Sequence, residues 1–134
     1  MLKNIPLLIV PFVLYNLVLA GAVETGPGDP FAQEILSVGM MSGGRWTMSL
    51  GDMLIVFGLI VLFFEIMKST RTNNASVLDH LLSTFVFVAF LVEFLLVADA
   101  AHPVFFILMV MTLVDVLAGF SVTIRAAGRD VNLY

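Results

Sequence analysis

Three isolated carboxylic acids, Glu65, Glu93 and Asp115, lie inside long apolar stretches of this sequence. An acidic side chain at the centre of a membrane-spanning helix costs roughly 2.5 to 3.5 kcal/mol on insertion-derived scales, so each acid must face protein or water, or carry a proton. Carboxyl groups in such positions are typical of proton and cation pathways, and also of buried contacts that fix helix packing. The chemistry to consider is therefore proton or small-cation binding inside a membrane.

The depth of each acid follows from the helical rise of about 1.5 Å per residue. Counted from the cationic ends of their helices, Glu65 lies about 5 Å into the membrane, Asp115 about 15 Å and Glu93 about 25 Å. We expect a staircase of acids with steps of about 10 Å, which water would have to bridge. Only Glu65 is expected to form a direct salt bridge, either with Lys68 or with a cytoplasmic arginine.

Helical periodicity places these acids on polar or small-residue stripes that we expect to face the interior of a bundle. The stripes are Gly51, Gly58 and Glu65; Asp79, Ser83, Val86, Phe90 and Glu93; Thr112, Asp115, Gly119, Thr123 and Ala126; and Pro11, Tyr15 and Ala22. The expected hydrogen-bond partners of the acids are Ser83, Thr84, Thr112, Ser121, Tyr15 or Asn16. The predicted intramembrane polar residues are therefore Glu65, Glu93, Asp115, Thr112 and Ser83.

Composition indicates the elements that position these residues. The chain has 134 residues, of which 60% are hydrophobic and 12% charged, and its mean hydropathy is +1.09, which is too apolar for a water-soluble domain. Four apolar stretches can form transmembrane helices, at about 5–23, 51–68, 77–98 and 103–125. We predict an all-α integral membrane protein in which residues 1–134 form a single bundle of four transmembrane helices.

The first apolar stretch has an alternative interpretation as a cleaved signal peptide. Lys3 precedes its apolar core, and Ala20, Gly21 and Ala22 have the small-x-small form of a cleavage site. We expect this stretch to be retained as a helix.

Local signals mark where the later helices begin and end. They are capping boxes at Ser49 with Asp52 and at Ser76 with Asp79, a first-turn proline at Pro103, and a terminating glycine at Gly128.

Cations gather on one side of the predicted bundle. On that side lie Lys3, Lys68, Arg71, Arg125 and Arg129, and on the other side Arg45 alone. Because cytoplasmic segments carry the excess of lysine and arginine, we expect both termini in the cytoplasm. The loop over residues 24–50 is then external.

This external loop is predicted to form a short interfacial helix and a turn. Phe31, Ile35, Val38 and Met41 recur at helical spacing, and Asp29 can cap the helix. The glycines that follow permit a tight hairpin or a re-entrant turn, so the loop anchors the protein at the membrane surface or, alternatively, closes a cavity as a gate. The predicted interfacial residues are Arg45 and Trp46 in this loop and Asp79 and His80 at the opposite membrane surface.

Several kinds of chemistry are disfavoured by the sequence. The absence of cysteine excludes disulfides, thiolate catalysis and Fe–S clusters, and a net charge of −4 with scattered cations argues against nucleic-acid binding. His80 and His102 fall at opposite membrane surfaces, so one subunit cannot clamp a haem between them, although a symmetric dimer could. Two histidines are also too few for a catalytic zinc site. Ser83 with Asp79 and His80 gives no triad beyond sequence proximity. We expect no enzyme activity, no metal and no cofactor.

Two functional hypotheses remain. In the favoured one, the acids fix helix packing, and the protein is an accessory or scaffolding component that self-associates in the bilayer or joins a larger membrane complex. In the alternative, Glu65, Asp115 and Glu93 line a proton- or cation-conducting path or a transporter site. A small multipass protein without large loops is typical of the bacterial inner membrane, where we expect it.

Overall fold

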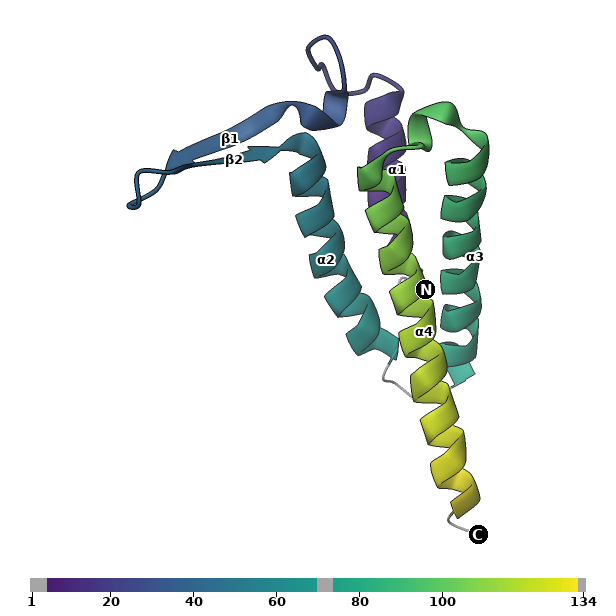
Figure 1. The fold of residues 1–134 in the computed structure, drawn as a ribbon. Coiled ribbons are helices and arrows are strands. Elements are labelled where there is room, and N and C mark those ends of the chain that lie inside the picture. Colours follow the sequence, from purple (N-terminus) through teal and green to yellow (C-terminus); the bar gives the residue numbers. More distant parts are fainter. Residues whose placement is uncertain (1–4, 70–73, 133–134) are drawn as a thin grey trace.

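The computed structural model describes the backbone of residues 5–69 and 74–132, and the side chains of these residues except 69, 74–76, 123 and 126–132. Within this part, helices stand side by side and a β-hairpin projects from one end (Figure 1). The elements are α1 (Ile9–Leu19), the 3-10 turn η2 (Pro30–Ala32), β1 (Glu34–Gly39), β2 (Arg45–Ser49), α2 (Leu50–Ser69), α3 (Asn74–Leu96), the 3-10 turn η3 (Ala98–Ala100) and α4 (Pro103–Asn132). The end with the hairpin, η2 and η3 is called the hairpin end, and the end with Lys68 the lysine end.

Three helices in the described part are long and apolar enough to cross a membrane: Leu50–Lys68, Val77–Leu96 and Pro103–Val122. α1 has 11 residues and is therefore about 16 Å long, against about 30 Å of bilayer hydrocarbon. It ends early because Gly21 adopts a φ of +83° and the amides of Gly21 and Ala22 bond back to the carbonyls of Val18 and Leu17, which stops the helix. The predicted helix over residues 5–23 is too long.

α4 is the central helix. Of the residues in its apolar span, 44% are buried, against 22% in α2 and in α3. α2 and α3 each pack on α4 far more than on each other, and the C-terminal part of α4 runs past both at the lysine end (Figure 1). Polar groups on the three long helices therefore meet along α4.

Two of the four predicted helix boundaries are confirmed. The amide of Ser49 donates to the Asp52 carboxylate while the amide of Asp52 donates to the Ser49 hydroxyl, which is the reciprocal pattern of a capping box. α4 begins at Pro103 as expected.

The other two boundaries are wrong. α3 begins at Asn74, two residues before the predicted cap at Ser76, so Asp79 lies inside the helix. α4 continues through Gly128 to Asn132, because a glycine within a helix lowers its stability without breaking its hydrogen bonds. Of the cations used for orientation, Lys3, Arg71 and Arg129 have side chains outside the described part.

The predicted interfacial helix is replaced by an antiparallel hairpin. Asp29 does act as a cap, but for the short turn η2, since its carboxylate accepts the Phe31 amide at 3.0 Å. The chain then extends into β1, and Gly43, with a φ of +88°, turns it back into β2. The apolar residues at helical spacing also fit a strand, and the neighbouring segment 45–49 supplies the backbone partner that a strand requires.

An aromatic core holds the hairpin end together. The Tyr15 ring of α1 stacks on Phe31 with centroids 4.2 Å apart and also contacts Phe105 of α4 at 4.8 Å. Phe105 in turn contacts Phe90 of α3 at 5.0 Å. The Tyr15 hydroxyl donates to the carbonyl of Asp99 at 3.0 Å, so its polar end is satisfied. These contacts fix α1 against the bundle although it is short.

Candidate functional site

Four charged side chains from the three long helices meet at the lysine end. Glu65 and Lys68 come from the last turns of α2, Asp79 from the first turns of α3, and Asp115 from the middle of α4. These four residues are called the acid–lysine cluster. The three carboxyl groups are nearly inaccessible to solvent, with 1% of Glu65 and 5% each of Asp79 and Asp115 exposed.

Lys68 connects the cluster to the N-terminal segment. Its ammonium donates to Glu65 Oε1 at 3.0 Å and to the carbonyl of Ile5 at 2.8 Å, and it lies 3.2 Å from Asp79 Oδ1. Glu65 Oε1 also accepts the amide of Leu7 at 2.8 Å. Pro6 lies between these two anchors, so the cluster binds the chain where it enters α1. The expected contact between Glu65 and Lys68 is confirmed.

Asp115 completes the cluster from α4. Its carboxyl lies within hydrogen-bonding distance of the Glu65 carboxyl and of the Ser83 hydroxyl. Ser83 is one turn beyond Asp79 on α3, so both side chains face α4 as the predicted stripe requires. The expected hydroxyl partner of Asp115 is thus Ser83.

The predicted staircase is wrong at its first step. Glu65 and Asp115 were expected about 10 Å apart in depth, yet their carboxyl groups are neighbours. The reason is that α4 extends beyond the other helices at the lysine end (Figure 1), so counting from Arg125 exaggerates the depth of Asp115.

His80 and Gly119 pack together beside the cluster. A Cβ atom placed on Gly119 would lie 2.4 Å from Nδ1 of the imidazole, so only glycine leaves room for this ring against α4. Nε2 of His80 is buried and has no hydrogen-bond partner among the described residues. Asp79 and His80, which were predicted to be interfacial, are therefore packed between helices, Asp79 almost completely and His80 in part.

Glu93 lies apart from the cluster, on the hairpin side of an apolar layer. Its carboxyl faces the Asn16 side chain of α1, and Oε2 is buried without a partner among the described residues. The buried side chains of the apolar layer are Val61, Val86, Phe90, Leu108 and Met111. Thr112 is buried near this layer, but its hydroxyl donates to the carbonyl of Met109 on its own helix. Thr112 therefore offers no donor to an acid.

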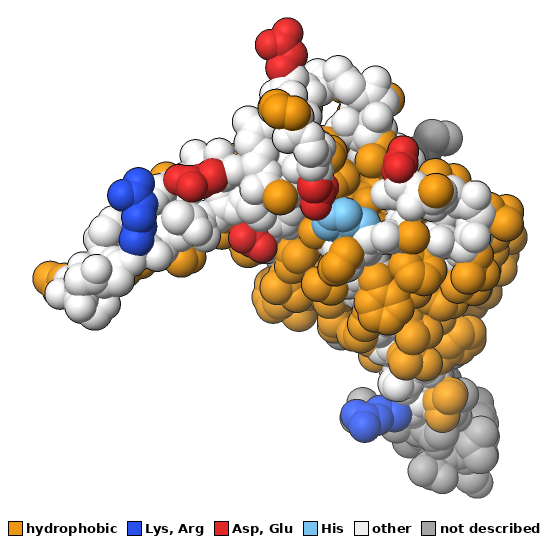
Figure 2. All heavy atoms as spheres, turned by 45° about the horizontal axis from the view of Figure 1, so that its top comes forward, with side chains coloured by type: hydrophobic (Ala, Val, Ile, Leu, Met, Phe, Trp, Pro, Cys, Tyr) orange, Lys and Arg blue, Asp and Glu red, His pale blue; other side chains and the backbone are white. Residues whose placement is uncertain are grey.

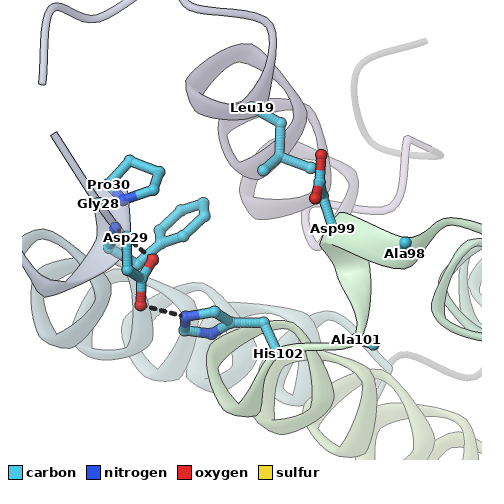
Figure 3. Close-up of a pocket in the computed structure, with 9 residues that line it drawn as sticks. Leu19, Gly28, Asp29, Pro30, Ala98, Asp99, Ala101 and His102 are labelled. Carbon is cyan, nitrogen blue, oxygen red and sulfur yellow. Dashed lines mark hydrogen bonds and ion pairs between the residues drawn. The ribbon is translucent and has the colours of Figure 1, made fainter.

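A second polar feature is a cavity of about 430 Å³ at the hairpin end (Figure 3). On one side of it Asp29 and His102 point toward each other, with Oδ2 and Nε2 2.7 Å apart, and Asp99 lies on another side near Leu19. The amide of Val104 donates to His102 Nδ1 at 3.1 Å, so the His102 side chain caps the start of α4. Since Nδ1 accepts a hydrogen bond, the ring proton is on Nε2 and is donated to Asp29.

This hydrogen bond controls the charge state of Asp29. Donation from His102 stabilises the carboxylate and holds the pKa of Asp29 below its ordinary value, and the Phe31 amide acts in the same direction. Asp29 is therefore ionised at neutral pH and ties the loop before η2 to the start of α4.

The predicted interfacial pair Arg45 and Trp46 lies on the projecting hairpin. Both side chains are exposed, and the two neighbouring residues point to opposite faces of the strand. Trp46 pairs with Val38, and Met48 with Leu36, which makes one face of the hairpin apolar. Arg45 lies on the other face and bonds to the Ser37 hydroxyl.

Sequence reasoning missed two parts of the site. It gave no role to the backbone of residues 5–7, because main-chain donors and acceptors carry no sequence signal. It placed Gly119 on an inward stripe without identifying His80 as its neighbour, because the relative height of two helices is not encoded in either one.

Within the described residues, no group of three or more acid or imidazole side chains is arranged to hold a metal ion. Comparison with protein families, curated proteins and solved structures finds no match to this chain.

Proposed function

We propose that this chain is a membrane-embedded accessory or scaffolding protein that self-associates or joins a larger membrane complex, without catalytic or transport activity of its own. The observation that carries the proposal is how the charges of the bundle are used. Lys68 binds two acids and the N-terminal backbone, so the cluster acts as a tie between elements. A site that bound and released substrate would instead keep polar groups free toward an opening.

The apolar layer supports the same proposal. Phe90 and Leu108 are completely buried between Glu93 and the acid–lysine cluster. A conducting path needs water or exchangeable polar groups along its length, and a packed apolar layer removes both. The interior therefore resembles a structural core, which leaves the outer surface for interactions.

The outer surface has two parts suited to interactions in a membrane. Hydrophobic side chains cover the body of the bundle in the view of Figure 2, whereas acidic and histidine side chains gather at the hairpin end. The hairpin extends beyond the bundle and presents a largely polar face in this view. An arm of this kind increases the reach of a small protein along the membrane surface, where a partner can be contacted.

The proposal is tested by purification in a mild detergent followed by native mass spectrometry. We expect an oligomer of this chain or a defined complex with other membrane proteins. A Gly43→Val substitution strains the hairpin turn, where φ is +88°, and should weaken this assembly. Gly26→Ala, where a Cβ meets nothing within 4 Å, is the matched control. A monomer under all conditions that retain native lipid would contradict the proposal.

The conducting alternative keeps one favourable observation, the meeting of Glu65, Asp79 and Asp115 at one end of the bundle. Reconstituted vesicles distinguish the two proposals. Conduction would be favoured if the protein makes a pH gradient across the vesicle membrane decay faster, and if the Asp115→Asn variant returns the decay to the rate of vesicles without protein. Equal decay with and without the protein favours the accessory function.

A further inference from the structure

In the acid–lysine cluster, Oε2 of Glu65 lacks both a hydrogen-bond donor and a nearby cation among the described residues. Glu65 is 1% exposed, and its Oε1 receives both the Leu7 amide and the Lys68 ammonium. Its Oε2 is buried, and no donor among the described residues reaches it. The carboxyl of Asp115 also lies within hydrogen-bonding distance of the Glu65 carboxyl. Two acceptors thus face each other where a donor is required.

We propose that Glu65 and Asp115 bind one proton between them, and that this proton holds the N-terminal segment on the bundle. Two carboxyl groups in contact and shielded from water are most stable when they share a single proton. We place the proton on Asp115, which donates it to Glu65 Oε2, because Glu65 Oε1 already receives two donors whereas Oε2 receives none from the described residues. This proposal goes beyond the accessory function and does not depend on it.

The other charged and titratable groups facing the pair agree with this assignment. α2 contributes Lys68, the cation of the cluster among the residues that the structure describes. Lys68 also lies against Asp79 of α3. α3 further contributes His80, whose ring packs on α4 at Gly119. With all three carboxyl groups ionised, one ammonium would face three negative charges in a buried place. One bound proton reduces that excess without any new contact.

Release of the proton would act on the N-terminal segment through Glu65. A second carboxylate beside Glu65 repels its charge and competes for Lys68, and these two residues hold the Leu7 amide and the Ile5 carbonyl. Residues 5–8 precede the helix, and the carbonyls of Pro6 and Leu7 accept the amides of Ile9 and Val10. The two contacts with Glu65 and Lys68 are what tie the Leu7 amide and the Ile5 carbonyl to the bundle. Proton loss is therefore expected to loosen this segment while the aromatic contacts of Tyr15 keep the rest of α1 in place.

Infrared difference spectroscopy of the protein in lipid bilayers tests where the proton lies. We expect the C=O band of a protonated carboxyl at neutral pH, lost at alkaline pH and absent from Asp115→Asn. Glu65→Gln should shift this band, because the partner of the Asp115 hydroxyl changes. Glu93→Gln is the matched control, and it should leave the band of the pair in place. If the spectra contain no carboxyl band that depends on both Asp115 and Glu65, the proposal is overturned.

Cysteine labelling tests the coupling to the N-terminal segment, since the natural sequence has no cysteine. Leu8 is 2% exposed, so a thiol at Leu8→Cys should be protected from maleimide at neutral pH and become accessible at alkaline pH. Ser42→Cys, exposed in the hairpin turn, corrects for the effect of pH on thiol reactivity. In combination with Asp115→Asn, whose amide donates at every pH, Leu8→Cys should stay protected. A corrected labelling rate that rises equally with and without Asp115→Asn would overturn the coupling.

Discussion

At the scale of single residues, two glycines on the inward stripes differ in what surrounds them. A Cβ on Gly119 would lie 2.4 and 2.6 Å from two atoms of the His80 ring, which is rigid. A Cβ on Gly58 would lie 2.9 Å from the ends of Leu108 and Met111, which are flexible. The cost of adding one methyl group should therefore depend on the neighbour rather than on the glycine.

We predict that Gly119→Ala lowers the free energy of unfolding by about 1 to 3 kcal/mol, as overpacking against a rigid group does. Gly58→Ala should change it by less than about 1 kcal/mol, because alanine favours the helix and the neighbouring side chains can move. Unfolding in detergent micelles, followed by circular dichroism, measures both variants. Equal destabilisation by the two substitutions would contradict the argument.

The Asp29–His102 contact predicts how stability depends on pH. Because the hydrogen bond from His102 lowers the pKa of Asp29 in the folded protein, it contributes stability above the ordinary carboxyl pKa of about 3.9. That contribution is lost as the pH falls through the lowered pKa. We expect Asp29→Asn, which still caps Phe31, to reduce the melting temperature at neutral pH and to match the natural protein at the acid end.

Melting temperatures of the two proteins between pH 2 and about pH 7 measure this difference. His102→Gln is a useful companion, since it removes the imidazole. In this background, the melting temperatures with and without Asp29→Asn should differ less across the acid range. A difference that stays constant with pH would show that Asp29 stabilises the fold only through its shape.

At the scale of the elements, the long helices could be predicted and the hairpin could not. α2, α3 and α4 are apolar over enough residues that hydropathy alone locates them. Phe31, Ile35 and Val38 fit a helix and a strand equally well over so short a distance, and pairing with residues 45–49 decides between the two. Strand pairing is a contact between segments, which periodicity within one segment does not contain.

The candidate site shows the same division. The stripes correctly selected Glu65, Ser83 and Asp115 as buried residues, because the helical period fixes direction around each axis. Their relative heights were not predicted correctly, since these depend on how far α4 extends past its neighbours. Sequence therefore determined which side chains face inward, and packing determined which of them meet.

The apolar face of the hairpin predicts that it lies on the membrane surface. Leu36, Val38, Trp46 and Met48 share this face, while Arg45 is on the other. The hairpin joins the N-terminal end of α2 and extends sideways, away from the helices (Figure 1), which suits an element in the plane of the bilayer. Tryptophan is enriched at this depth because its ring is amphipathic.

Trp46 is the one tryptophan in the chain, so its fluorescence reports on the hairpin without interference. We expect a blue-shifted emission in vesicles, quenched more strongly by lipids brominated near the headgroups than by lipids brominated near the chain ends. Val38→Lys, which charges the cross-strand neighbour of Trp46, should reduce the quenching. Emission typical of tryptophan in water, with no quenching by either lipid, would place the hairpin away from the membrane.

At the scale of the whole molecule, the N-terminal segment determines how many times the chain crosses the bilayer. α1 alone is too short, but the segment from Ile5 to Tyr15 contacts both ends of the bundle. The Ile5 carbonyl binds Lys68 at the lysine end, and the Tyr15 hydroxyl binds the Asp99 carbonyl at the hairpin end. An irregular start followed by a short helix can therefore cover the same depth as α2, since packing against the bundle satisfies its backbone.

We predict that this segment is a fourth crossing and that both chain ends lie on the side of the lysine end. Single cysteines at Ser42 in the hairpin turn and at Asp99 should react with an impermeant maleimide from one side of the membrane, and a cysteine at Arg125 from the other side. A tag before residue 5 should be accessible from the same side as Arg125, because Ile5 is anchored there by Lys68. Accessibility of that tag from the side of Ser42 would instead mean three crossings, with α1 and its preceding residues folded back within one half of the bilayer.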